Sequence, residues 1–272
     1  MKFSCSSSVL AAAGATDFTS LVDSAAALGC GALDLACGAD GILTPEHFSF
    51  RDSGAMVCHA QAKQVEIQCL SGGELATTSI DAEWDATVRR ISMAHALACP
   101  LVALTTPLVL DEATYGEEYD RLIGVLHELL DFARDLNICL GIESAPGSFA
   151  AGAAETADLV EDTARGNLGI IHTLGAAGAV GQEECRDAAA LAQDCLLYVR
   201  LAGPDAGAIA GGMFDVAIRA LHAASFGGYI GDCSVCSRTA SAAEAQRQMR
   251  ANLAHMQALC GGPACDCVGH RH

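Results

Sequence analysis

Basic residues are scarce in this sequence of 272 residues: lysine and arginine number 15 against 33 aspartates and glutamates, a formal net charge of −18. No basic patch offsets this charge, so phosphate backbones and anionic membrane surfaces would be repelled. Long apolar runs are also lacking, because no stretch reaches the roughly twenty residues that span a bilayer, and the start has no continuous apolar signal core. We therefore expect a cytoplasmic protein with no nucleic-acid partner and no membrane contact.

Aromatic residues are few as well, at 5% of the sequence, although apolar residues make up 51%. Alanine, leucine, valine and glycine must therefore fill the core, which is typical of helices packed closely on a sheet. Most of the fourteen cysteines lie inside apolar segments, as Cys30, Cys58, Cys99, Cys139 and Cys195 do. In a reducing compartment such cysteines are expected to be small core residues and not disulfides.

Apolar runs and amphipathic segments alternate along the whole chain. Strands are expected over 2–6, 31–35, 65–70, 101–105, 138–143, 168–172, 196–201 and 228–232. Helices are expected near 17–28, 51–63, 81–98, 115–136, 154–164, 182–194, 213–225 and 241–259. Strict alternation requires a parallel sheet with helical crossovers, and eight units close a barrel. We predict an α/β protein with a single (β/α)8 TIM barrel over residues 1–259 and a flexible tail over 260–272.

An open doubly wound sheet is the alternative architecture. It is disfavoured because no glycine-rich phosphate turn of the G-x-G-x-x-G or G-x-x-x-x-G-K type follows the first expected strand. In a barrel the site lies at the carboxyl ends of the strands, so polar residues at those ends are the candidates for chemistry.

Glu143 is the strongest of these candidates. An apolar strand ends on this carboxylate, and Pro146 and Gly147 follow after two intervening residues. A buried carboxylate must be paired, protonated or bound to a metal. An ion pair with Arg200 across the barrel mouth is the structural alternative to a functional role. His172 is expected on a strand as a metal ligand or general base, or as a hydrogen-bonded core histidine.

Asp232 and Cys233 close the last expected strand, and Cys233 begins a C-x-x-C with Cys236. One such pair is a weak metal or redox signal, because zinc sites of this type usually need a second pair. The tail offers thiols and imidazoles that would complete a soft-metal site, with a disordered end as the alternative. These tail residues are Cys260, Cys265, Cys267, His270 and His272.

Three segments, 28–35, 138–143 and 220–229, resemble the xylose isomerase-like TIM-barrel superfamily of sugar isomerases, sugar and inositol-type epimerases and apurinic-site endonucleases. The resemblance covers nearly the whole chain and implies the barrel fold. It also implies an isomerase or epimerase acting on a small sugar-like polyhydroxy compound. One divalent metal (Mn, Mg or Zn) is implied as the cofactor, held by Glu, Asp, His and Glu at strand ends. The absence of any cofactor is the alternative.

At the four implied metal positions this sequence has Glu143, Thr173, Arg200 and Cys233. Threonine and guanidinium are poor ligands for Mg²⁺ or Mn²⁺. In addition, Arg200 puts a permanent positive charge where the cation would sit. That charge would neutralise Glu143 or bind a substrate anion, with Thr173 and Cys233 also lining the substrate site. A one-residue slip would instead group Glu143, His172 and Asp232 as metal ligands, provided that a bulge offsets the alternation of side chains.

Three hypotheses for the function follow. In the first, Glu143 is the acid/base of an isomerase or epimerase that moves a proton next to a carbonyl, and a metal or Arg200 stabilises the enediolate. In the second, the protein is a non-catalytic relative that has lost its metal site and acts as a binding or partner subunit, or as a homo-oligomer. In the third, Cys69, Cys233, Cys236 and the tail form a soft-metal or redox site.

Overall fold

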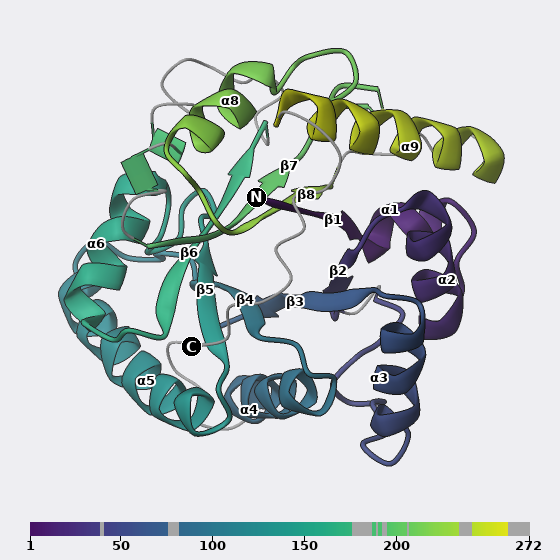
Figure 1. Cartoon of the computed structure of the whole chain (residues 1–272). Coiled ribbons are helices and arrows are strands. Elements are labelled where there is room, and N and C mark those ends of the chain that lie inside the picture. The colour runs from purple at the N-terminus through teal and green to yellow at the C-terminus, as the bar shows by residue number, and fades with distance from the viewer. Residues whose placement is uncertain are drawn as a thin grey trace.

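The computed structural model describes residues 1–38, 41–75, 82–175, 187–188, 190–191, 195–205, 207–233 and 241–260. Eight parallel strands form a closed barrel in chain order, and helices surround it (Figure 1). The strands are β1 (Lys2–Ser6), β2 (Ala32–Ala36), β3 (Glu66–Glu74), β4 (Leu101–Thr105), β5 (Cys139–Glu143), β6 (Leu168–Leu174), β7 (Leu196–Leu201) and β8 (Tyr229–Asp232). The predicted (β/α)8 barrel is therefore confirmed.

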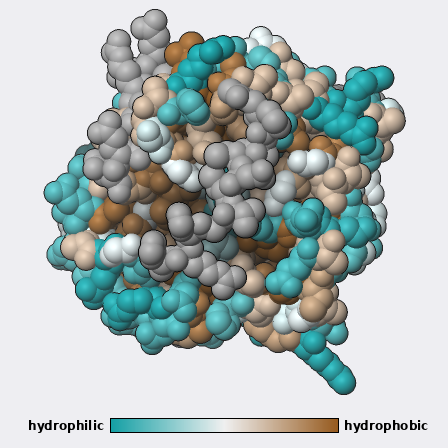
Figure 2. Space-filling model, in the orientation of Figure 1, coloured by the Kyte–Doolittle hydropathy of each residue, from teal (hydrophilic) through white to brown (hydrophobic). Residues whose placement is uncertain are grey.

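The helices cover the outside of the barrel (Figure 1). They are α1 (Ser7–Ala12), α2 (Phe18–Leu28), α3 (Ser53–Ala62), α4 (Ala82–Ala96), α5 (Tyr115–Asp135), α6 (Ala153–Thr163), α8 (Asp215–Ala223) and α9 (Ala242–Leu259). Hydrophilic side chains line much of the outline of the molecule, whereas hydrophobic ones show nearer the middle of this face (Figure 2). No helix in the described parts of the chain is both long and apolar enough to cross a membrane.

Local sequence signals explain the helix boundaries, as α2 shows. Asp17 accepts a hydrogen bond from the Ser20 backbone N–H at 2.7 Å, and the Ser20 hydroxyl accepts one from the Asp17 N–H at 3.0 Å. This capping box satisfies free N–H groups of the first turn. The helix ends at Gly29, whose φ of 78° is the left-handed conformation that glycine adopts at no steric cost. Between these ends, Leu21 and Ala25 are fully buried.

The barrel interior is narrow, and small residues make room for a few large ones. Its buried apolar side chains are Ala32, Cys69, Leu101, Ala103, Ile171, Tyr198 and Tyr229. A Cβ on Gly141 would lie 2.6 Å from Ile171, and a Cβ on Gly231 would overlap the Tyr198 hydroxyl. Glycine at these two positions therefore allows Ile171 and Tyr198 to fill the centre.

Three boundaries differ from the sequence-based expectations. The serine-rich segment after β1 forms the short helix α1, because the Ser6 side chain caps it at the Ser8 N–H. Ser71 to Gly73 do not break β3, which continues to Glu74 through a register irregularity between Leu70 and Gly73. Strand β6 runs on to Leu174, so His172 lies within the strand and not at its end.

Two expectations lie outside the described residues. The helix expected near 182–194 falls largely there, and so do residues 261–272 of the predicted tail. The expectation of core cysteines holds for Cys30 and Cys99, which are buried, whereas Cys58 is exposed on α3.

Candidate active site

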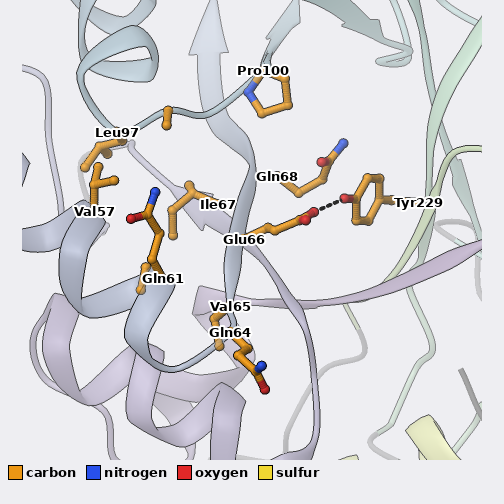
Figure 3. Close-up of a pocket in the computed structure, with 12 residues that line it drawn as sticks. Val57, Gln61, Gln64, Val65, Glu66, Ile67, Gln68, Leu97, Pro100 and Tyr229 are labelled. Carbon is orange, nitrogen blue, oxygen red and sulfur yellow. Dashed lines mark hydrogen bonds between the residues drawn. The ribbon is translucent and has the colours of Figure 1, made fainter. Parts of the chain in front are cut away.

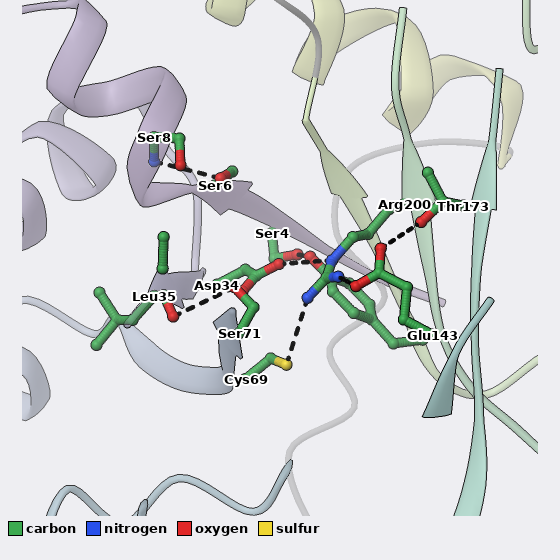
Figure 4. A network of polar contacts seen from close by, with 12 residues as sticks. Ser4, Ser6, Ser8, Asp34, Leu35, Cys69, Ser71, Glu143, Thr173 and Arg200 are labelled. Carbon is green, nitrogen blue, oxygen red and sulfur yellow. Dashed lines mark hydrogen bonds and ion pairs between the residues drawn. The ribbon is translucent and has the colours of Figure 1, made fainter. Parts of the chain in front are cut away.

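A cluster centred on Arg200 joins strands from opposite sides of the barrel at their carboxyl ends (Figure 4). The Arg200 Nε donates to Asp34 Oδ2 at 2.9 Å, and its Nη1 donates to Glu143 Oε2. The Nη2 group lies 3.8 Å from the Cys69 sulfur. One guanidinium therefore bridges β2, β3, β5 and β7, using all three of its nitrogens.

Glu143 is the member of this cluster that reaches solvent. Its side chain is 23% exposed, compared with 7% for Arg200 and 2% for Asp34. Thr173 donates to Glu143 Oε1 at 2.8 Å, so both carboxylate oxygens accept hydrogen bonds. The carboxylate thus has a fixed orientation, with an edge toward the barrel mouth.

Asp34 lies deeper than Glu143 and has two donors. The Ser71 hydroxyl donates to Asp34 Oδ1 at 2.8 Å, and Arg200 occupies the other oxygen. The extension of β3 past Leu70 is what places Ser71 beside β2, where it pairs with Ala36. Asp34 is one of the polar residues near the strand ends, but no spacing in the sequence indicates its partner.

An aromatic ring, that of Tyr198, packs against the Arg200 guanidinium inside the barrel. The Arg200 guanidinium lies 5.3 Å from the centre of the Tyr198 ring, a cation–π distance. The Tyr198 hydroxyl shares a hydrogen bond of 2.8 Å with Ser4 Oγ, which satisfies it inside the barrel. Burial raises the pKa of Tyr198, so the phenol stays neutral.

Burial and charge fix the protonation states around the cluster. Burial opposes the charged form of Arg200, but attraction from Asp34 and Glu143 outweighs it, so the pKa of the guanidinium is raised. Burial, and next the charge of Asp34, raise the pKa values of the Cys69 and Cys233 thiols. Both cysteines therefore carry protons at neutral pH and are poor nucleophiles.

The structure brings together three of the predicted site residues, Glu143, Thr173 and Arg200. Cys233 follows β8, and its N–H donates to Leu201 O at 3.0 Å. The third hypothesis, a soft-metal site, also needs Cys236 and residues 261–272, which lie outside the described residues.

The predicted metal set of Glu143, His172 and Asp232 is not assembled. Thr173 pairs with Arg200 in the β6–β7 ladder, so His172 points to the opposite face of its strand. Asp232 accepts a hydrogen bond of 2.8 Å from Asn252 on α9, outside the barrel. Across the described ranges, no three His, Cys, Asp or Glu side chains are grouped to hold a metal ion.

A separate groove of about 730 Å³ lies at the other end of the strands (Figure 3). Its polar lining includes Gln61, Gln64, Gln68 and Glu66, and Glu66 accepts a hydrogen bond from the Tyr229 hydroxyl. Glu66 and Tyr229 begin β3 and β8, so this groove opens at the amino-terminal face. Barrels of this class carry out chemistry at the carboxyl ends, which places the candidate site at the Arg200 cluster.

A family model described as xylose isomerase-like TIM barrel matches residues 22–258. The chain belongs to this family. Three similar solved structures cover nearly all of it at low sequence identity. D-psicose 3-epimerase with D-fructose is 17% identical over 96% of this chain and 100% of that one, with a TM-score of 0.76. The zinc-bound IolI protein is 12% identical over 96% and 98%, with a TM-score of 0.74.

The third structure, 3-keto-D-glucoside 4-epimerase YcjR from E. coli, is 10% identical over 95% of this chain and 99% of that one, with a TM-score of 0.73. No curated protein sequence matches this chain significantly. At these identities the structural matches support the fold. The chemistry of this chain must be argued from its own residues.

The residues at the implied metal positions do not suit a divalent cation. The guanidinium of Arg200 lies between Asp34 and Glu143 and already neutralises part of their charge. The hydroxyl of Thr173 is used as a donor to Glu143, and a cysteine thiol, as at position 233, is not a ligand that hard ions such as Mg²⁺ or Mn²⁺ prefer.

Proposed function

We propose that this protein is an isomerase or epimerase that binds a small polyhydroxy carbonyl compound at the carboxyl-end mouth of the barrel. Glu143 would carry a proton to and from the carbon next to the carbonyl. The observation that supports this role is the placement of its carboxylate, partly exposed at the mouth and oriented by Thr173 and Arg200. Family membership and the sugar epimerases among the similar structures support the substrate class.

The charge balance of the cluster supports this proton transfer. When Glu143 takes the proton, it becomes a neutral acid, and the negative charge appears on the substrate oxygen as an enediolate. Arg200 loses one anionic partner at that moment, so its positive charge stabilises the new anion beside it. Return of the proton from Glu143 to the neighbouring carbon, while the hydroxyl proton moves to the former carbonyl oxygen, gives the isomer. The epimer forms when solvent water delivers a proton to the other face of the first carbon and Glu143 releases the proton it took to solvent.

Thr173 and Cys233 are proposed to contact the substrate. Thr173 already donates to Glu143 and would hold the carboxylate in place while the proton moves. Cys233 carries a protonated thiol, which offers a weak donor and no negative charge to a hydroxyl-rich substrate. Their contribution is positioning, since neither side chain is a base at neutral pH.

The substitution Glu143→Gln tests the proposal. Glutamine keeps the size of the side chain and still accepts the Thr173 hydrogen bond, but it cannot take up a proton. We expect a loss of about 10²-fold or more, the usual contribution of a positioned acid/base. The measurement is deuterium uptake from D₂O next to the carbonyl of D-fructose and other ketoses, followed by NMR, which detects proton abstraction even without net conversion.

Glu117→Gln is the matched control, because Glu117 is exposed in the first turn of α5 and makes the same change of charge. Its deuterium uptake should equal that of the wild type. Equal uptake in Glu143→Gln as well would rule out Glu143 as the acid/base.

One observation favours a second function, a non-catalytic binding or partner subunit. Both oxygens of Glu143 already accept hydrogen bonds, and Arg200 pairs with two carboxylates, as in a structural ion-pair network. This alternative expects no deuterium uptake in the wild type, and it expects a stable complex with itself or another chain. Light scattering on the purified protein measures the assembly, and turnover by an isolated monomer would exclude this alternative.

A further inference from the structure

Arg200 is locked into the mouth of the barrel more firmly than a surface arginine would be. Its Nε bonds Asp34, whose side chain is only 2% exposed, and Ser71 holds the other oxygen of that carboxylate. If the guanidinium swung out, Asp34 would remain buried without its counter-ion, which is a costly state. The positive charge is therefore a permanent part of the site.

We propose that the Arg200 guanidinium is the fixed cation of this site and makes the barrel independent of a divalent metal. It lies where the family resemblance implies a metal ligand, and it contacts two carboxylates that would otherwise attract an ion. The binding part of this inference stands without the proposed function. Only the role of Arg200 beside the enediolate rests on it.

The potential metal ligands near Arg200 also argue against a divalent cation in this site. A hard divalent ion needs several oxygen or imidazole ligands, and within hydrogen-bonding range of Arg200 the described residues offer only the carboxylates of Asp34 and Glu143. An ion placed beside them would share the space with a guanidinium of like charge. Arg200 with its two carboxylates has a net charge of −1, so the site is close to neutral before any ion arrives.

Asp34 and Ser71 act as positioning residues in this scheme. Asp34 is buried and Ser71 donates to it, and together they set the direction in which the guanidinium points toward Glu143. The planar, always charged side chain of arginine makes such two-sided pairing possible, and lysine has no equivalent geometry.

The test is metal binding by the full chain, purified without an affinity tag and stripped with EDTA. Mn²⁺, Co²⁺ and Zn²⁺ are titrated separately by calorimetry into the wild type and into Glu143→Ala. We expect no stoichiometric site that depends on Glu143, and we expect deuterium uptake by the wild type to be unchanged by EDTA. A site bound equally by both proteins lies away from the mouth and agrees with the inference.

One equivalent of metal that binds the wild type and is lost in Glu143→Ala would overturn the inference. A constructive variant adds a second readout: Thr173→Asp, Arg200→His and Cys233→Glu together rebuild an oxygen and imidazole set around Glu143. This triple variant, checked for folding by circular dichroism, should gain one Mn²⁺ site visible by electron paramagnetic resonance. A metal-free wild type without turnover would refute the proposed function and leave this inference intact.

Discussion

Replacing Arg200 by methionine tests how much the ion-pair cluster contributes to the stability of the barrel. Methionine keeps most of the aliphatic packing but removes the charge. Asp34 would then be a buried carboxylate with a single remaining donor, Ser71 at 2.8 Å. Breaking a buried pair in this way costs about 3–5 kcal/mol. The Glu143 pair adds only about 1 kcal/mol or less, because that carboxylate is partly exposed and screened by solvent.

We therefore expect Arg200→Met to lower the free energy of unfolding by about 4 kcal/mol. In a chain of this size that corresponds to a Tm lower by roughly 10 °C. Urea unfolding followed by circular dichroism measures the change, which should appear as a lower midpoint with an unchanged m-value. Arg121→Met is the control: Arg121 is exposed on α5, so its replacement should stay within about 0.5 kcal/mol of the wild type.

Adding Asp34→Asn to Arg200→Met separates lost charge pairing from lost packing. The neutral amide removes the uncompensated charge, so the double variant should be more stable than the sum of the two single losses indicates. Contacting charges usually give a coupling of about 0.5–3 kcal/mol. A loss below about 1 kcal/mol for Arg200→Met, or strict additivity with Asp34→Asn, would refute Arg200 as the buried counter-ion.

Two further predictions concern the frame of the site. Gly231→Ala should destabilise the barrel by about 1–3 kcal/mol or more, because the new Cβ overlaps the Tyr198 hydroxyl. Gly124→Ala is the control: nothing lies near its Cβ, so it should stabilise α5 by about 0.5–1 kcal/mol. Urea unfolding measures the free energy of unfolding of both variants. Hydrogen bonds from Ser20 lower the pKa of Asp17. Asp17→Asn should therefore lower the Tm above about pH 3.9, and the deficit should vanish as pH falls through the lower folded pKa.

The alternation of strands and helices was predictable because it depends on local periodicity. The expected strands 101–105 and 196–201 coincide with β4 and β7, and the expected helix 115–136 agrees with α5 to one residue. Glu143 could also be recognised as a site candidate from the local sequence alone, because it is a charged residue at the end of an apolar strand.

The course of β3 was not predictable, because it depends on tertiary contacts. Glycines at 72 and 73 usually indicate the end of a strand. Here Gly72 has a φ of 92°, and a Cβ on it would lie 2.9 Å from Gly38 N, so glycine permits a bulge beside the end of β2. The bulge carries Ser71 to Asp34, a contact that no sequence pattern indicates.

The partners of Arg200 show a second limit of sequence analysis. The sequence suggested a pair with Glu143, but Asp34 lies 166 residues away on β2. Closure of the barrel brings β2 and β7 across from each other. Which carboxylate would face Arg200 inside the barrel could not be predicted from the sequence. The grouping of Glu143 with His172 and Asp232 failed for the related reason that a one-residue slip turns a side chain to the other face.

The Arg200 guanidinium both stabilises the fold and sets the charge of the site. A substitution that changes the charge of the site therefore also changes the stability of the barrel. Replacing Arg200 alone cannot restore a metal site, because Asp34 would stay buried without a partner and the barrel would lose stability first. A return to metal chemistry must therefore change several strand ends together. Glu143 is different: it is partly exposed and keeps the Thr173 bond as glutamine, so its substitution changes proton transfer with a smaller effect on folding. Differences between Glu143 and Arg200 variants thus separate the chemistry of this barrel from its stability.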